Sequence, residues 1–279
     1  MNIPHFDFGG DKSPMHFLHA NGYPPECYKP LLELLQKQHH LFGMKLRPLW
    51  DDAKIEDVKS WNIFSDDLLR FLPTVTPDSA IGVGHSIGAV VTLRAALRNP
   101  KKFRALVLFD PVLFMPSFIA MWKVIYALGL GSRIHPKVSG ALKRRKTFDN
   151  LETVFHGYRT REVFKYMTDE NLKIYIEGIT KPKSDGGYEL AFSPEWESHI
   201  YLTGLQDFDI WNAMHKLEMP TLIIRGAESD TYSKRADNLI KKKNPKIQIE
   251  VLEKATHILP LEYPQEVFDI MNKFLKEIL

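Results

Sequence analysis

The chain has almost no cysteine and no long apolar run. Cys27 is the only cysteine among 279 residues, which excludes an intrachain disulfide and makes a cysteine-rich metal site implausible. No segment approaches the roughly 20 apolar residues of a membrane span, and the nearest, residues 112–130, is interrupted by Pro116, Lys123 and Gly129. The first residues lack a basic leader followed by a long apolar core. We therefore expect a cytoplasmic protein with no signal peptide and no membrane span.

A dominant sign of charge is also lacking. The formal net charge is only +3, so no general affinity for nucleic acid is implied. Two basic runs, residues 143–146 and 241–243, are interpreted as solvated helix faces, with a nucleic-acid or localisation patch as the alternative. No H-x-x-x-H motif or carboxylate cluster indicates a metal site, so we expect neither a metal nor a cofactor. The oligomeric state is left open.

What the chain does have is a regular alternation of strand and helix patterns. Buried strands are expected at residues 15–18, 41–46, 79–84, 104–110, 220–226 and 247–252, with a weak first strand at 5–8. Amphipathic helices are expected at 28–38, 61–72, 87–98, 233–243 and from 264 to the end. Such alternation predicts an α/β fold with a mostly parallel central sheet and helices on both faces.

One region interrupts the alternation. Residues 111–206 read as mainly helical, without a clear buried strand, between two strands of the sheet. We interpret this region as an inserted cap or lid, and residues 1–110 with 207–279 as the core. The alternative is a second helical layer with no gating role.

A serine lies between two glycines where a strand is expected to become a helix. In Gly84-His85-Ser86-Ile87-Gly88 the glycines give the clearance that a sharp turn needs, and the helix that follows supplies free N–H groups, Ile87 first. Such a turn can expose the Ser86 hydroxyl above the sheet edge. The G-x-S-x-G pattern alone is weak, with an ordinary helix N-cap as the alternative, but its place in the strand order strengthens it.

A nucleophilic serine needs a base and an acid that orients it. Asp230 follows one late strand and His257 follows the last, so both are expected at carboxyl ends of parallel strands, where open α/β sheets place their sites. Asp230 is the preferred acid. Asp110, at the end of the strand at 104–110, is the alternative, and Glu228 is interpreted as a loop carboxylate.

These motifs together resemble the α/β-hydrolase superfamily, over nearly the whole chain outside residues 111–206. The segment 84–88 resembles its nucleophile elbow, 225–230 its acid loop and 255–267 its histidine loop. The segment 18–24 resembles the oxyanion loop, although Ala20-Asn21 departs from the common His-Gly form. The resemblance implies the order Ser86, Asp230, His257 for a triad. It implies oxyanion donors at Ile87 and Asn21, with Gly22 or Tyr23 as alternatives to Asn21.

The resemblance and the serine together predict a carboxylesterase-type hydrolase that acts through an acyl-enzyme on a small-molecule ester. A stripe of apolar side chains just after residue 110 either packs the cap or lines an acyl pocket, in which case short to medium apolar acyl esters are expected. The pocket candidates in this stripe are Phe114, Phe118, Met121 and Trp122. The alternatives are a C–C bond hydrolase, thioesterase or amidase with the same triad, and a slow-turnover ligand receptor on the same fold.

Overall fold

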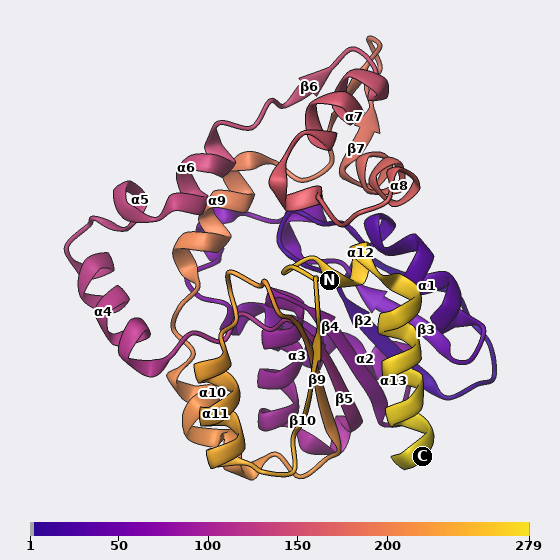
Figure 1. Cartoon of the computed structure of the whole chain (residues 1–279), viewed down its shortest axis with the longest axis vertical. Coiled ribbons are helices and arrows are strands. Elements are labelled where there is room, and N and C mark those ends of the chain that lie inside the picture. The colour runs from indigo at the N-terminus through magenta and orange to yellow at the C-terminus, as the bar shows by residue number, and fades with distance from the viewer. Residues whose placement is uncertain (1–2, 279) are drawn as a thin grey trace.

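The computed structural model describes residues 3–278 and is built around one seven-stranded sheet (Figure 1). Its strand order is β1-β3-β2-β4-β5-β9-β10, and every neighbouring pair is parallel except β1 with β3. The strands are β1 (His5–Asp7), β2 (Pro14–Leu18), β3 (His40–Met44), β4 (Ala80–His85), β5 (Phe103–Phe109), β9 (Thr221–Gly226) and β10 (Gln248–Leu252). The predicted mostly parallel sheet is confirmed.

Helices cover both faces of this sheet. They include α1 (Lys29–Gln36), α2 (Asn62–Val75), α3 (Ile87–Arg98), α10 (Phe208–Ala213), α11 (Lys234–Lys243), α12 (Leu259–Glu262) and α13 (Pro264–Ile278). Buried side chains of α2, α3 and α11 form one apolar core, and those of α1, α12 and α13 form a second. Because β4 is buried on both faces, its first five residues form a continuous run of small and apolar side chains.

Several turns of 3-10 helix connect these elements. They are η1 (Pro25–Tyr28), η2 (Arg47–Leu49), η3 (Ile55–Asp57), η4 (Pro100–Lys102), η5 (Glu162–Phe164) and η6 (Met214–Lys216). The long helices and core strands lie within a few residues of where the sequence pattern predicts them, and α3 has the predicted bounds.

Residues 111–206 stand above the carboxyl ends of the strands (Figure 1). They hold α4 (Pro116–Ala127), α5 (Gly131–Ile134), α6 (Pro136–Leu142), α7 (Leu151–Arg159), α8 (Asp169–Ile179) and α9 (Pro194–Thr203). They also hold a small antiparallel sheet in the order β6-β8-β7, made of β6 (Thr147–Phe148), β7 (Thr180–Pro182) and β8 (Tyr188–Leu190). The sequence reading missed these strands because two or three residues are too few to show a period of two.

None of the helices described within residues 3–278 has the length and apolar character needed to cross a membrane.

Candidate active site

Ser86 occupies a strained turn between β4 and α3. Its backbone has φ 58° and ψ −119°, which a residue with a side chain rarely adopts. A Cβ on Gly84 would lie 2.5 Å from the Gly88 carbonyl carbon, and one on Gly88 would lie 2.2 Å from the Leu18 carbonyl oxygen. Only glycine fits at either position. The clearance expected from the two glycines is therefore present, and it lets α3 pack close to the sheet.

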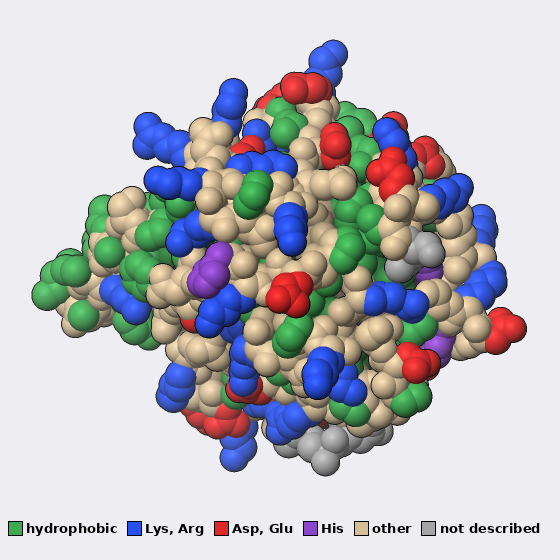
Figure 2. Space-filling view, turned by 90° about the horizontal axis from the view of Figure 1, so that it is seen from below, with side chains coloured by type: hydrophobic (Ala, Val, Ile, Leu, Met, Phe, Trp, Pro, Cys, Tyr) green, Lys and Arg blue, Asp and Glu red, His purple; other side chains and the backbone are tan. Residues whose placement is uncertain are grey.

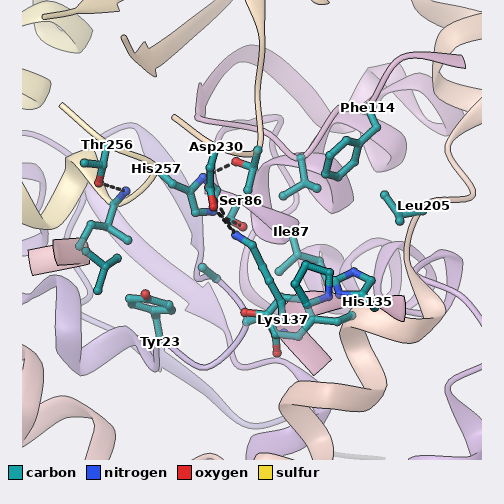
Figure 3. A pocket seen from close by; sticks show the side chains of 18 of the residues that line it. Tyr23, Ser86, Ile87, Phe114, His135, Lys137, Leu205, Asp230, Thr256 and His257 are labelled. Carbon is teal, nitrogen blue, oxygen red and sulfur yellow. Dashed lines mark hydrogen bonds and ion pairs between the residues drawn. The ribbon is translucent and has the colours of Figure 1, made fainter. Parts of the chain in front are cut away.

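His257 reaches Ser86 from the loop that follows β10. Its Nε2 lies 2.9 Å from the Ser86 Oγ, and the two side chains meet in the pocket of Figure 3. Ser86 is 7% exposed, so its hydroxyl faces this pocket from an otherwise buried turn. The structure thus brings together two of the three predicted triad residues, at a distance suited to proton transfer.

The third predicted residue, Asp230, does not orient His257 in the described structure. Its carboxylate is 66% exposed and pairs with Lys137, whose Nζ lies 3.1 Å from Oδ2. The carboxylate facing the imidazole belongs to Asp110, which directly follows β5 and is fully buried: its Oδ2 lies 3.4 Å from His257 Nδ1. The geometry therefore favours the alternative that the sequence left open.

Two hydroxyl groups extend the link between Asp110 and His257. Thr231 Oγ1 lies 2.7 Å from His257 Nδ1 and 3.3 Å from Ser229 Oγ. Ser229 Oγ donates to Asp110 Oδ1 at 3.0 Å. With the imidazole proton on Nδ1, donation can run from Nδ1 to Thr231, then to Ser229 and to Asp110. This arrangement leaves Nε2 free to accept the proton of Ser86.

The surroundings keep His257 ready to act as a base. Burial first, and then the nearby Lys137 ammonium, lower the pKa of His257 to about 3, against an opposing effect of Asp230. The imidazole is therefore neutral at neutral pH. Burial raises the pKa of the Asp110 carboxyl, while the Ser229 hydroxyl and the Arg225 guanidinium oppose that rise.

Two elements bring candidate oxyanion donors to the cavity, because Ile87 and Asn21 both line it with Ser86. Ile87 is the first residue of α3, so its N–H has no acceptor within the helix. In the loop after β2, the Ala20 N–H bonds the Tyr28 hydroxyl at 3.2 Å and the Tyr23 N–H bonds the Ala20 carbonyl at 3.3 Å. Among the described residues, Asn21 and Gly22 donate no backbone hydrogen bond. The backbone N–H groups of Asn21 and Gly22 are therefore the candidate oxyanion donors in this loop, whereas the N–H of Tyr23 is already bonded.

A buried chain of hydrogen bonds joins this loop to the histidine loop. Ala20 donates to the Tyr28 hydroxyl, which lies 2.6 Å from His85 Nδ1. His85 Nε2 lies 2.8 Å from the carbonyl oxygen of His257 and must donate to it. His85 therefore points away from Ser86 and holds the backbone of His257. Sequence reasoning missed this role because Tyr28 and His85 are far apart in the chain.

Residues 111–206 also hold the loop after β2. The Asn21 side-chain amide donates to the Glu197 carbonyl oxygen of α9 at 3.0 Å. The Glu197 carboxylate forms a mostly buried ion pair with Arg144 and lies against Gly22, where an added Cβ would meet its carboxyl carbon at 3.1 Å. Gly22 has φ 77°, a second reason for glycine. No pattern in the sequence indicates this contact.

Ser86 and His257 open into a cavity of about 590 Å³, a size typical of small-molecule sites. Three of the four predicted pocket residues, Phe114, Phe118 and Trp122, line it. The prediction for Met121 is wrong: its side chain is 51% exposed and lies outside the lining. One step along a helix turns the side chain by about 100°, so the pocket face of α4 carries Phe118 and Trp122 but excludes Met121.

Ion pairs cross the polar side of the cavity. Lys137 of α6 reaches Asp230 in the loop after β9, and Figure 3 shows the two side chains in front of Ser86. Lys165 pairs with Glu228 at 2.7 Å, and the Tyr166 hydroxyl donates to the same carboxylate at 2.6 Å. Each contact joins residues 111–206 to the loop after β9. Within the described chain, no group of three or more His, Cys, Asp or Glu residues is placed to hold a metal ion.

Comparisons with known proteins all point to one family of hydrolases. The family described as "Alpha/beta hydrolase family" matches residues 17–270. A proline iminopeptidase of Heyndrickxia coagulans is 22% identical, over 98% of this chain and 94% of its own. A 2-(acetamidomethylene)succinate hydrolase of Mesorhizobium japonicum is 23% identical, over 94% and 87%.

Solved structures show the same likeness. The crystal structure of E-2-(acetamidomethylene)succinate hydrolase superposes with a TM-score of 0.77 at 21% identity, covering 98% of this chain and 95% of that one. An esterase of M. tuberculosis superposes with a TM-score of 0.74 at 17% identity, over 98% and 88%. At these identities the likeness shows the fold. The reactions of these proteins differ.

Proposed function

The chain belongs to the alpha/beta hydrolase family, and from that premise we propose that it is a serine hydrolase that cleaves carboxylic esters through an acyl-enzyme. The observation that carries the proposal is the 2.9 Å contact between Ser86 Oγ and His257 Nε2, in a cavity of small-molecule size. A serine hydroxyl with a neutral base in contact is the arrangement that nucleophilic attack on a carbonyl requires.

His257 accepts the Ser86 proton as Oγ attacks the ester carbonyl, and then returns the proton to the leaving alcohol. The N–H groups of Ile87 and Asn21 stabilise the oxyanion, each contributing about 3 kcal/mol to the transition state. Gly22 is the alternative second donor. In the second step water takes the place of the alcohol. His257 accepts a proton from the water as it attacks the acyl-enzyme carbonyl, and then returns the proton to Ser86 Oγ as the carboxylic acid leaves.

Asp110 is the acid of the triad in this proposal. It lies at the end of β5, the strand next to β4 in the sheet, so its carboxylate approaches Nδ1 from the side opposite to Ser86. It stabilises the imidazolium that forms when His257 takes the serine proton. Asp230 instead joins Lys137 at the edge of the cavity.

Residues 111–206 serve as the cap, and half of the residues that line the cavity come from them. Figure 3 shows Phe114 and Leu205 on the side of Ser86 away from His257. Because the leaving group must lie near His257 to receive its proton, these apolar side chains face the acyl group. This arrangement supports the preference for apolar acyl esters of short to medium length.

The test is active-site labelling together with turnover. A fluorophosphonate probe should label the wild type, and Ser86→Ala should lose the label because it lacks the nucleophilic oxygen. p-Nitrophenyl esters of graded chain length should be hydrolysed, with kcat/KM highest for short to medium chains. Labelling that survives in the alanine variant overturns the assignment of the nucleophile.

Other substrates distinguish the alternatives. If the probe labels the wild type and esters are not hydrolysed, but an acyl thioester, amide or β-diketone is cleaved, then the same residues catalyse that other reaction. The relatives described above include a peptidase and a succinate-derivative hydrolase by name, so these substrate classes belong in the same panel. Tight binding of an ester with negligible turnover supports a ligand receptor instead.

A further inference from the structure

Exposed apolar side chains are concentrated on one part of the cap. Of ten large apolar residues that are strongly exposed in the described chain, seven lie between residues 118 and 142. They are Phe118, Met121, Val124, Tyr126, Leu128, Ile134 and Leu142. Figure 1 shows α4 and α5 projecting from the side of the molecule, and Figure 2 shows hydrophobic side chains gathered on the projection at the same edge. Contiguous apolar surface of this kind marks an interaction site.

Helix α4 is apolar on its exposed side as well as on its packed side. Ile119 and Trp122 are buried against the protein, while Val124 and Leu128, at the end of the helix, are 60% and 67% exposed. A helix that is apolar all round is normally covered on every side. With 12 residues, α4 is about 18 Å long, too short to cross a bilayer core of about 30 Å. A membrane that covered the exposed side would therefore hold α4 in its surface, with the packed side of the helix on the protein.

The charges on the segment that contains this helix are of one sign. Residues 111–148 contain seven Lys and Arg residues and no Asp or Glu, although the whole chain has nearly equal numbers of both. Arg145 and Lys146 pair with Asp149 and Glu195, and Arg144 pairs with Glu197. Arg133 and Lys143 are exposed and form no ion pair with any described residue. An apolar face bordered by unpaired cations is complementary to an anionic lipid surface.

We propose that α4, α5 and the start of the loop after α6 dock the protein on an anionic lipid surface, with the exposed apolar residues in the headgroup region. A second copy of the chain is the less favourable occupant. In a two-fold dimer the same patch meets itself, so unpaired cations would face cations. The cap also joins this surface to the cavity, because Phe118 and Trp122 line the cavity from the same helix. An apolar ester held in the lipid would therefore lie beside the proposed acyl side.

The test is sedimentation with vesicles, which does not depend on ester turnover. Wild type should bind vesicles of phosphatidylcholine with 30% phosphatidylserine, and bind much less to phosphatidylcholine alone or in 0.5 M NaCl. Val124→Ser with Leu128→Ser should weaken binding at least about tenfold, because two exposed apolar groups are lost. Arg133→Gln with Lys143→Gln should weaken it by about 25-fold, since each cation near an anionic surface contributes roughly a fivefold factor.

Matched controls lie on the core. Val251→Ser removes an exposed apolar group of β10. Lys242→Gln with Lys246→Gln removes two cations from the region of α11 that form no ion pair within residues 3–278. Both should leave vesicle binding unchanged. Circular dichroism and fluorophosphonate labelling should be unchanged in all variants, because none of these residues lines the cavity. Should the serine pair fail to fold, the glutamine pair decides the question by itself.

Two results overturn the proposal. One is the absence of binding to anionic vesicles by folded wild type. The other is a dimer, detected by light scattering, that Val124→Ser with Leu128→Ser dissociates, because the patch is then covered by a second copy.

Discussion

Replacing Asp110 and Asp230 separately by asparagine decides which carboxylate orients His257. Asparagine preserves the size of each side chain and removes its charge. Asp110 is fully buried and lies 3.4 Å from Nδ1, whereas Asp230 is 66% exposed and pairs with Lys137. The two variants therefore test a buried and an exposed carboxylate that follow neighbouring strands of one sheet.

The size of the Asp110→Asn effect follows from the contact distance. At 3.4 Å and an effective dielectric constant of about 20, a carboxylate stabilises an imidazolium by about 5 kcal/mol. At 1.36 kcal/mol per factor of ten, this corresponds to a loss of roughly 10³ to 10⁴ in kcat. The Thr231 hydroxyl still contacts Nδ1 in the variant and preserves part of the orientation of the ring. We therefore expect a loss near the lower end, about 10³.

Stability should move in the opposite direction to activity. Burial raises the pKa of Asp110 in the folded protein, so its ionised form destabilises the fold at any pH above about 4, the value of an unfolded aspartate. A neutral amide removes this cost. At pH 7 the free energy of unfolding of Asp110→Asn should therefore equal or exceed that of wild type, and the difference should shrink as the pH falls toward 4.

Asp230→Asn should change kcat/KM by no more than about fivefold, since an exposed ion pair contributes less than about 1 kcal/mol. The assay is steady-state hydrolysis of p-nitrophenyl butyrate, with the rate of fluorophosphonate labelling as a measure independent of turnover. Urea unfolding gives the stability of each variant. A 10³-fold loss in Asp230→Asn with near-normal activity in Asp110→Asn would refute the reasoning and return the acid role to Asp230.

Two further predictions concern the groups around His257. Lys137→Gln removes a cation that lowers the pKa of His257 and also leaves the Asp230 charge unpaired, so the acid limb of the pH profile of kcat/KM should move to higher pH. Asp230→Asn should move it to lower pH, and an unmoved limb in both variants would show that neither charge acts on His257. Tyr28→Phe leaves the Ala20 N–H and His85 Nδ1 without a partner in the core, so the free energy of unfolding should fall by about 2 kcal/mol or more. Tyr28→Phe should also lower kcat about tenfold, because His85 holds the His257 backbone. Urea unfolding measures the loss of stability and steady-state kinetics measure the loss of kcat. An unchanged free energy of unfolding together with an unchanged kcat would show that the chain of hydrogen bonds is not needed.

The order of strands and helices was readable from the sequence alone. Periodicity of apolar residues depends on short-range geometry, so it predicts α3 with its observed bounds and the core strands to within a few residues. Ser86 and His257 were predictable for the same reason. The parallel sheet places the loops after β4 and β10 at one edge, and the two glycines beside Ser86 indicate the turn before any contact is known.

Only the tertiary structure shows which carboxylate faces His257. Asp110 and Asp230 follow β5 and β9, which are neighbours in the sheet, so strand order brings both carboxylates near His257. The choice between them depends on local backbone conformation. Asp110 adopts φ 41° and lies buried 3.4 Å from His257 Nδ1, while the loop after β9 carries Asp230 outward to Lys137. A sequence pattern does not contain these torsion angles.

Residues 111–206 show the same division between what the sequence predicted and what the structure decided. Their helices were predictable, but which face of each turns inward was not, so Phe118 and Trp122 line the cavity while Met121 faces outward. The contact of Glu197 with the loop after β2 joins residues more than 170 positions apart. Location in the cell stays a prediction. The sequence by itself determined the elements and the proposed reacting pair, because local patterns encode them. Long-range packing decided which carboxylate faces His257, which side chains line the cavity and which face of α4 is exposed, because each depends on how distant segments meet.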